Sequence, residues 1–214
     1  MNKILKLSAI ALLASSVSAM AQKTGVSIAV FGAIAGAEVE GSGSSSNAPA
    51  GSGSGSAGKV TPIGGFDIGY NFNPNIAIGA TYIPVDAKIG SGAVDGSTVS
   101  GKLKDHYTIY IEPAFVINKD ASLYARVQYA HADLTLTGAT GSNKLEGYGV
   151  GVGLKTFLNA NTFVRAEANY TEYDSISGRN VTTGGGGPEN NRTTTTVSGT
   201  PYLAQGIISI GYQF

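Results

Sequence analysis

Apolar and polar positions alternate along the last segment of the chain. From Tyr202 to Phe214, aromatic and aliphatic residues recur on one parity: Tyr202, Ala204, Ile208, Ile210, Tyr212 and Phe214. A period of two predicts a β-strand with one apolar face. No segment follows this strand to fold back over that face, so we expect lipid to cover it.

The same alternation recurs in seven earlier segments. The eight predicted strands are 26–39, 60–72, 75–87, 102–117, 121–136, 145–158, 162–175 and 202–214. Tight polar turns at 73–75, 118–120 and 159–161 alternate with longer links at 41–58, 88–101, 137–144 and 176–201. Short turns at one end and long loops at the other predict an all-β fold, an eight-stranded antiparallel up-and-down transmembrane β-barrel. A soluble secreted β-sandwich is the alternative, because its strands also alternate.

Two of the longer links have biased composition. The Gly/Ser-rich link 41–58 follows a single strand, which could not form a domain alone, so we expect a disordered surface loop rather than an interdomain linker. The link 176–201 contains the runs Gly184–Gly187 and Thr193–Thr196, and we expect a long, exposed loop there too.

Aromatic residues fall at two heights on the predicted apolar face. Six tyrosines lie 8 to 12 positions from their short-turn end or the C-terminus, which matches the roughly 9–11 residues that cross the hydrocarbon. The outer set is Tyr82, Tyr107, Tyr129, Tyr148, Tyr170 and Tyr202, and the inner set is Phe72, Phe115, Tyr212 and Phe214. Two aromatic girdles are typical of transmembrane barrels, and they favour the barrel over the sandwich.

Charged residues gather on the opposite, lumen-facing parity. They are Asp67, Glu112, Arg126, Lys155, Arg165 and Glu167. The tight turns place Glu112 opposite Arg126 and Lys155 opposite Arg165. This cluster could be a gate or ion path, or an internal salt-bridge network. The second interpretation is favoured, because an eight-stranded barrel is only wide enough to be filled by its own side chains.

The N-terminus has the three parts of a secretory signal peptide. Lys3 and Lys6 precede the apolar run Leu7 to Val17, and Ala19-Met20-Ala21 forms a small-x-small cleavage site. A membrane anchor is the alternative, but the run is shorter than the ~20 residues of a spanning helix. We therefore expect residues 1–21 to be a cleaved signal peptide and residues 22–214 to form the barrel.

Composition excludes several other classes. The chain has no Cys, so it lacks disulfides, metal thiolates and thiol nucleophiles. Its 14 basic and 14 acidic residues balance, so nothing favours a nucleic-acid partner. After the signal peptide, no run of 18 apolar residues predicts a spanning helix.

Catalytic chemistry has little support in the sequence. The two histidines are predicted to face opposite sides of the wall, His106 the lumen and His131 the outside, and neither has nucleophile spacing to a Ser and an acid. His106 beside Asp105 could form a dyad, although an interfacial histidine is commoner. The glycines at 149, 151 and 153 lie within an alternating strand, so we interpret them as room for lumen side chains rather than a phosphate loop. We expect no enzyme activity, no cofactor and no metal.

The alternating strands, the short turns, Ala19-Met20-Ala21 and the terminal Gly211-Tyr-Gln-Phe214 together resemble the small bacterial outer-membrane barrels. This family includes the OmpA transmembrane domain, OmpX and the opacity proteins. The resemblance covers the whole mature chain and implies a Gram-negative outer membrane. It also implies that Phe214 is a recognition signal for the barrel-assembly machinery, and that the lumen charges resemble the internal network of the OmpA barrel.

The functional expectation is a monomeric barrel with a structural or adhesin-like surface role. Its partners would be membrane lipids, the assembly machinery and host or neighbouring-cell surface molecules that meet the loops. A narrow porin-like channel for small solutes or ions is the alternative. A lipid-modifying barrel enzyme is a third class.

Overall fold

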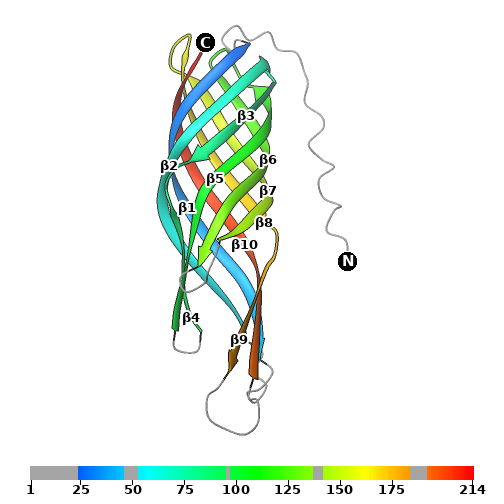
Figure 1. The fold of residues 1–214 in the computed structure, drawn as a ribbon. Coiled ribbons are helices and arrows are strands. Elements are labelled where there is room, and N and C mark those ends of the chain that lie inside the picture. The colour runs from blue at the N-terminus through cyan, green and yellow to red at the C-terminus, as the bar shows by residue number, and fades with distance from the viewer. Residues whose placement is uncertain (1–23, 46–52, 95–96, 137–141, 184–191) are drawn as a thin grey trace.

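The computed structural model describes residues 24–45, 53–94, 97–136, 142–183 and 192–214 (Figure 1). The predicted signal peptide lies outside these residues. The described part of the chain contains ten strands: β1 (Gly25–Ser45), β2 (Gly53–Asn73), β3 (Ile76–Ile83), β4 (Ala87–Val94), β5 (Ser97–Val116), β6 (Ala121–Leu136), β7 (Ser142–Phe157), β8 (Thr162–Tyr173), β9 (Ile176–Thr183) and β10 (Arg192–Gln213).

Eight of these strands close into a barrel. They follow the order β1-β2-β3-β5-β6-β7-β8-β10, and antiparallel pairing of β1 with β10 joins the two ends. The two remaining strands continue their predecessors beyond a break: β4 follows β3 and pairs with β5, and β9 follows β8 and pairs with β10. Pro84 lies in the first break, where a residue without an N–H cannot extend the ladder. The predicted eight-stranded antiparallel barrel is confirmed.

The barrel strands extend further than the sequence indicated. All four segments expected as loops, 41–58, 88–101, 137–144 and 176–201, contain paired strand. The hairpins project past the barrel at the end opposite the C-terminus (Figure 1). The β1–β2 pairing continues to Gly43 and Gly53, and β10 pairs with β9 from Arg192 to Gly199. Once two strands have begun to pair, each further residue pair adds hydrogen bonds without a new loop-closure cost. Strand pairing therefore continues into these polar, Gly-rich segments, which we had expected to be loops.

The three tight turns share one hydrogen-bonding device. The first residue of each is an asparagine whose Oδ1 accepts the backbone N–H two positions on, at 2.8 Å for Asn73, 2.9 Å for Asn118 and 3.0 Å for Asn159. Such Asx turns hold the chain in a tight reversal. The predicted turns are confirmed, and this end of the barrel is the end with short connections.

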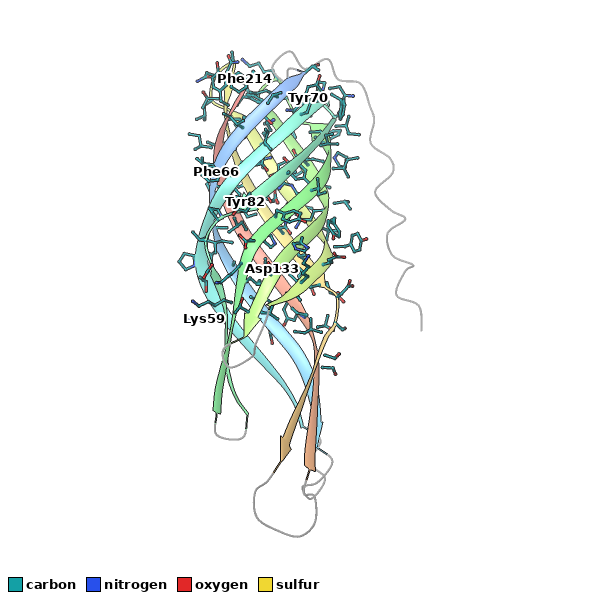
Figure 2. The ribbon with its side chains drawn as sticks, in the orientation of Figure 1. Lys59, Phe66, Tyr70, Tyr82, Asp133 and Phe214 are labelled. Atoms are coloured by element: carbon teal, nitrogen blue, oxygen red, sulfur yellow. The ribbon has the colours of Figure 1, made fainter. Side chains whose placement is uncertain are left out.

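The outer wall of the barrel is apolar. Side chains on one parity of each strand are exposed and mostly aliphatic or aromatic, among them Ile34, Phe66, Ile109, Val152 and Ile208. In Figure 2, Tyr70 and Phe214 lie near the short-turn end and Tyr82 lies further toward the hairpins. Within the described residues, no helix is long and apolar enough to cross a membrane.

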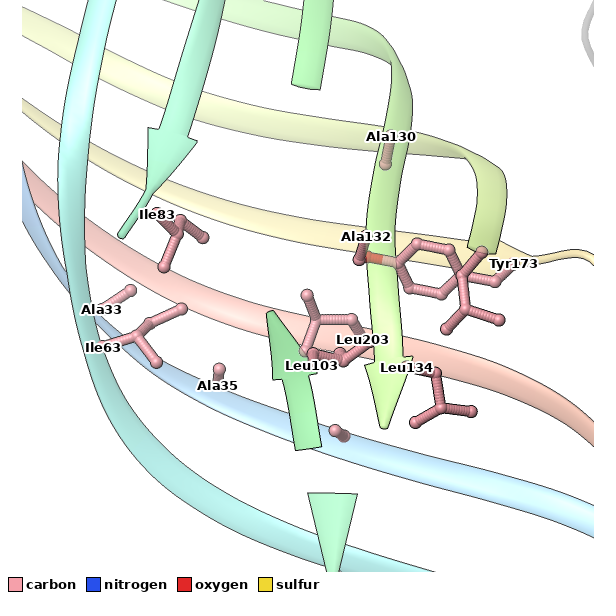
Figure 3. Packing of buried hydrophobic residues seen from close by; sticks show 12 residues of the cluster. Ala33, Ala35, Ile63, Ile83, Leu103, Ala130, Ala132, Leu134, Tyr173 and Leu203 are labelled. Carbon is pink, nitrogen blue, oxygen red and sulfur yellow. The ribbon is translucent and has the colours of Figure 1, made fainter. Parts of the chain in front are cut away.

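A second apolar region fills the interior toward the hairpin end (Figure 3). Its members come from β1, β2, β3, β5, β6, β7, β8 and β10: Ala33, Ala35, Ala37, Ile63, Ile83, Leu103, Ala130, Ala132, Leu134, Leu145, Tyr173 and Leu203. We call this set the apolar plug. It lies on the hairpin side of the charged interior positions, whereas a small cluster of Ala29, Phe157 and Phe163 lies near the short turns. The barrel therefore has a core inside and lipid-facing side chains outside.

Candidate functional site in the barrel interior

The six predicted lumen charges all face inward and are buried. Asp67 is on β2, Glu112 on β5, Arg126 on β6, Lys155 on β7, and Arg165 and Glu167 are on β8; each is at most 8% exposed. They reach the interior because successive side chains of a strand alternate between its faces. The neighbouring outward positions hold apolar residues.

Arg126 joins three carboxylates from three strands. Its Nη2 lies 2.9 Å from Glu112 Oε2 and 3.2 Å from Glu167 Oε2. The same nitrogen lies 3.7 Å from Asp67 Oδ2. The β5–β6 register pairs Tyr110 with Gln128 and Ile111 with Val127, which places Glu112 opposite Arg126 as the turn spacing indicated.

Arg165 is the second cation of the cluster. Its Nη2 lies 2.9 Å from Asp67 Oδ1, and its Nη1 lies 3.5 Å from Glu112 Oε2. Its Nε donates a hydrogen bond to Ser209 Oγ at 3.3 Å. Two guanidinium groups and three carboxylates therefore form one network, which we call the charged layer: Asp67, Glu112, Arg126, Arg165 and Glu167.

Lys155 stands apart from the charged layer. It is the register partner of Arg165, as the turn spacing indicated. Among the described residues, however, no carboxylate lies within ion-pair distance of its Nζ, which donates a hydrogen bond to Gln213 Oε1 at 3.2 Å. The ammonium lies 4.5 Å from the Phe163 ring centre and 5.0 Å from that of Phe157. Lys155 belongs to the short-turn end of the interior.

Two tyrosines that the sequence analysis did not single out complete the charged layer. Tyr110 donates to both carboxylate oxygens of Asp67 at 3.1 Å, and its ring centre lies 3.8 Å from the Arg126 guanidinium carbon. Tyr124 donates to Glu167 Oε2 at 2.8 Å. The available signal was inward parity, since both tyrosines share it with the neighbouring charges.

The interior glycines make room for the lumen side chains around them. A Cβ added to Gly153 would collide with the ring of Tyr124, and one added to Gly149 would lie 2.6 Å from Thr171 Oγ1. A Cβ added to Gly151 would lie 3.3 Å from Glu167 Oε1. The interpretation of these glycines as space for lumen side chains is confirmed.

Little space remains between the charged layer and the apolar plug. A void of about 20 Å³ is lined by Arg126, Arg165, His106 and Gln205, among others. A site of this size holds about one water molecule.

The two histidines lie on opposite sides of the wall. His106 is buried in the interior, where neither ring nitrogen has a hydrogen-bond partner. His131 lies on the outer side and stacks on Tyr107, with ring centres 4.9 Å apart. The described residues contain no cluster of three or more His, Cys, Asp or Glu side chains that could hold a metal ion.

The predicted aromatic residues lie on the outer face, several in direct contact. Tyr82 is the register partner of Tyr107. Ring centres are 5.7 Å apart for Tyr129 and Tyr148, and 5.9 Å apart for Tyr170 and Tyr202. Near the short turns, the contacts and register pairs are Phe72 with Tyr70, Phe115 with Leu123, and Tyr212 with Phe214.

Phe214 itself is attached through its backbone. Its N–H donates to Val26 O at 2.9 Å, and its side chain is 61% exposed on the lipid side. Its role as an assembly signal, implied by the resemblance, stays a prediction.

A closed antiparallel barrel with an apolar outer wall defines the class of transmembrane β-barrels. A family model described as the outer membrane protein beta-barrel domain matches residues 7–199, and the chain belongs to this family. Membership makes it a bacterial outer-membrane protein. Cleavage of the signal peptide stays a prediction.

Solved structures of other outer-membrane proteins resemble this barrel. OprG from Pseudomonas aeruginosa has a TM-score of 0.58 at 14% identity, over 89% of this chain and 97% of OprG, and shows the same fold. AlkL scores 0.48 at 17% identity, over 95% of this chain and 96% of AlkL. Ail, the attachment invasion locus protein of Yersinia pestis, has a TM-score of 0.39 at 13% identity, over 86% of this chain and 99% of Ail. A sequence search of curated proteins finds no match.

Proposed function

We propose that this protein is a non-conducting, non-enzymatic outer-membrane barrel whose hairpins interact with molecules at the cell surface. The observation that carries the proposal is the filled interior. The charged layer and the apolar plug occupy two successive levels of the lumen, and the strands continue beyond them. The barrel then acts as a rigid monomeric support for what it displays.

A permeation path would have to cross both levels. Opening the charged layer would separate buried guanidinium and carboxylate groups, which costs several kcal/mol when one partner is lost. Opening the plug would expose buried leucines such as Leu134 and Leu145 to water. The two barriers act in series, which supports a closed barrel over a narrow channel.

We expect the full-length protein to give no reproducible open steps in a planar lipid bilayer. The measurement is single-channel conductance, with a known porin as positive control for insertion. Steps that disappear when Arg126 or Lys155 is neutralised would establish a path through the lumen and overturn the closed-barrel proposal.

The hairpins supply the proposed interaction surface. Beyond the barrel, β2, β1, β10 and β9 lie next to one another as a four-stranded sheet, in which Ser42 pairs with Ser54 and with Ser198. Among the described residues, β9 pairs only with β10, so its other edge presents backbone donors and acceptors. Such an edge and a polar composition suit contact with host or neighbouring-cell surface molecules.

Deleting residues 41–58 or 177–199 is expected to abolish surface binding without unfolding the barrel. Ala37 already pairs with Lys59, so residues 38–40 can form the first new turn. Glu172 already pairs with Tyr202, so residues 173–176 with Thr200 and Pro201 can form the second. Adhesion of bacteria that express each variant tests binding, and heat-modifiable migration on a gel tests folding. Full adhesion by both folded deletion variants would contradict the proposed role.

A further inference from the structure

Beyond the barrel, the wall divides into two separate four-stranded sheets. One contains β2, β1, β10 and β9, and the other contains β4, β5, β6 and β7. The division follows from the two breaks in the ladder, because β4 pairs only with β5 and β9 only with β10 among the described residues. Each sheet therefore ends in two edge strands, whose outer sides have no strand partner in the part of the chain that the structure describes.

Three of these four edges have features that prevent strand addition. An open edge pairs with other chains unless a Pro, a Lys, a bulge or a short length blocks it. The free edge of β2 contains Lys59 and Pro62, and β4 contains Lys88 beside a register shift. On β7, only the short stretch Ser142–Glu146 extends past the pairing with β8.

β9 is the fourth edge, and it has none of these protections. It pairs with β10 residue for residue from Ile176 to Thr183, so no bulge interrupts it. The strand contains neither Pro nor Lys, and Arg179 is its one charged residue. Val181 and Thr182 are β-branched and favour an extended backbone. β9 is therefore suited to accept a further strand through main-chain hydrogen bonds.

We propose that β9 pairs antiparallel with β9 of a second copy of this protein, embedded in a facing outer membrane. This inference rests on the proposed surface role of the hairpins and names one partner for them. β9 projects from the barrel along the long axis of the molecule, away from the end where the C-terminus lies (Figure 1). A twofold axis that pairs two identical strands antiparallel is perpendicular to them, so the two barrels must point in opposite directions. Copies in one membrane point in the same direction, and facing membranes satisfy this geometry.

Symmetry and charge limit the register of this pair. In a symmetric antiparallel pair one residue faces its own copy, and the overlap is longest when that residue is Arg179 or Asn180. Centring on Arg179 would place like charges directly opposite, which is destabilising. Centring on Asn180 places Val181 opposite Arg179 of the other copy and aligns residues 177–183 of both strands. The pair then joins the two β2-β1-β10-β9 sheets into one continuous sheet between the two cells.

A single cysteine at position 180 tests this pairing, because the chain contains no other cysteine. Facing residues of an antiparallel pair have Cα atoms about 4.5–5.5 Å apart, which a disulfide can bridge. Two bacterial populations that express full-length Asn180→Cys with different epitope tags are mixed under mild oxidation, and we expect disulfide dimers that carry both tags. Ser42→Cys is the matched control and should give none, since Ser42 on β1 already pairs with Ser54 and Ser198.

Charge substitutions at position 181 test the register. A lysine there would face Arg179 of the other copy, whereas a glutamate would be attracted to it. Val181→Lys in the Asn180→Cys background should lower the yield of mixed dimer roughly fivefold, because like charges directly opposite on neighbouring strands are destabilising. Val181→Glu also introduces a charged side chain, and it should keep or raise the yield.

The remaining outcomes separate this partner from others. All variants should keep heat-modifiable migration, which shows that the barrel is folded. Dimers that carry one tag only would mean pairing within one membrane, and equal yields for the Lys and Glu variants would mean another register; either result overturns the proposal. Loss of host adhesion on deletion of 177–199, without any mixed dimer from Asn180→Cys, would leave the proposed function standing and overturn the second copy as the partner of β9.

Discussion

Replacing Arg126 by alanine is expected to destabilise the barrel by about 3–5 kcal/mol, the usual cost of removing one partner of a buried ion pair. Arg126 is 3% exposed and contacts Asp67, Glu112 and Glu167 within 3.7 Å. Without it, Asp67 and Glu112 would keep their contacts with Arg165, whereas Glu167 would lose its ion-pair partner among the described residues. The free energy of unfolding, from reversible urea titration in lipid vesicles, measures the effect.

An exposed ion pair supplies the control for this substitution. Lys119 lies 3.7 Å from Asp120 in a tight turn, and its side chain is 80% exposed. Lys119→Ala should change the stability by less than about 1 kcal/mol. Part of the loss in Arg126→Ala should be recovered by adding Glu167→Gln, which removes the charge left without an ion-pair partner. A loss below 1 kcal/mol in Arg126→Ala would mean that the charged layer does not hold the strands together.

That the charged side chains face the lumen could be predicted, because the alternation of side chains between the two faces of a strand is a local property of the sequence. Glu112 and Arg126 also belong to adjacent strands joined by a tight turn, so their pairing follows from the turn alone. Contacts across the lumen, such as Asp67 with Arg165, join strands that the turns do not connect. They depend on the stagger with which the barrel closes, and no short segment of sequence specifies that stagger.

The apolar plug was missed for a different reason. Leu134, Leu145 and Leu203 have inward parity and lie within predicted strands, but the inward face was read for its charges alone, so no apolar core was predicted there. Leu103 could not be placed by parity at all. The β5–β6 register shifts between Lys104 and Tyr107, and Asp105 has a φ of 48°, which marks a bulge that turns the preceding residues to the other face.

The substitution Leu203→Ala is expected to lower the free energy of unfolding by about 2–5 kcal/mol, the usual range when Leu→Ala leaves a cavity in a packed core. Leu203 is 2% exposed and packs in the plug with Leu103, Leu134 and Leu145. The surrounding wall is a closed ladder of hydrogen bonds, so it cannot collapse freely to fill the space. The same urea titration in vesicles measures the loss.

Leu154→Ala is the matched control on the lipid side. Leu154 is 43% exposed and faces outward on β7, so lipid fills the space that the side chain leaves and no cavity remains. Its loss of stability should be clearly smaller than that of Leu203→Ala. The Leu203 variant should also stay closed in a planar bilayer, because the charged layer still blocks the lumen below the plug. Equal losses for the two leucines would show that the interior residues pack no more tightly than lipid does, and the plug would then not be a core.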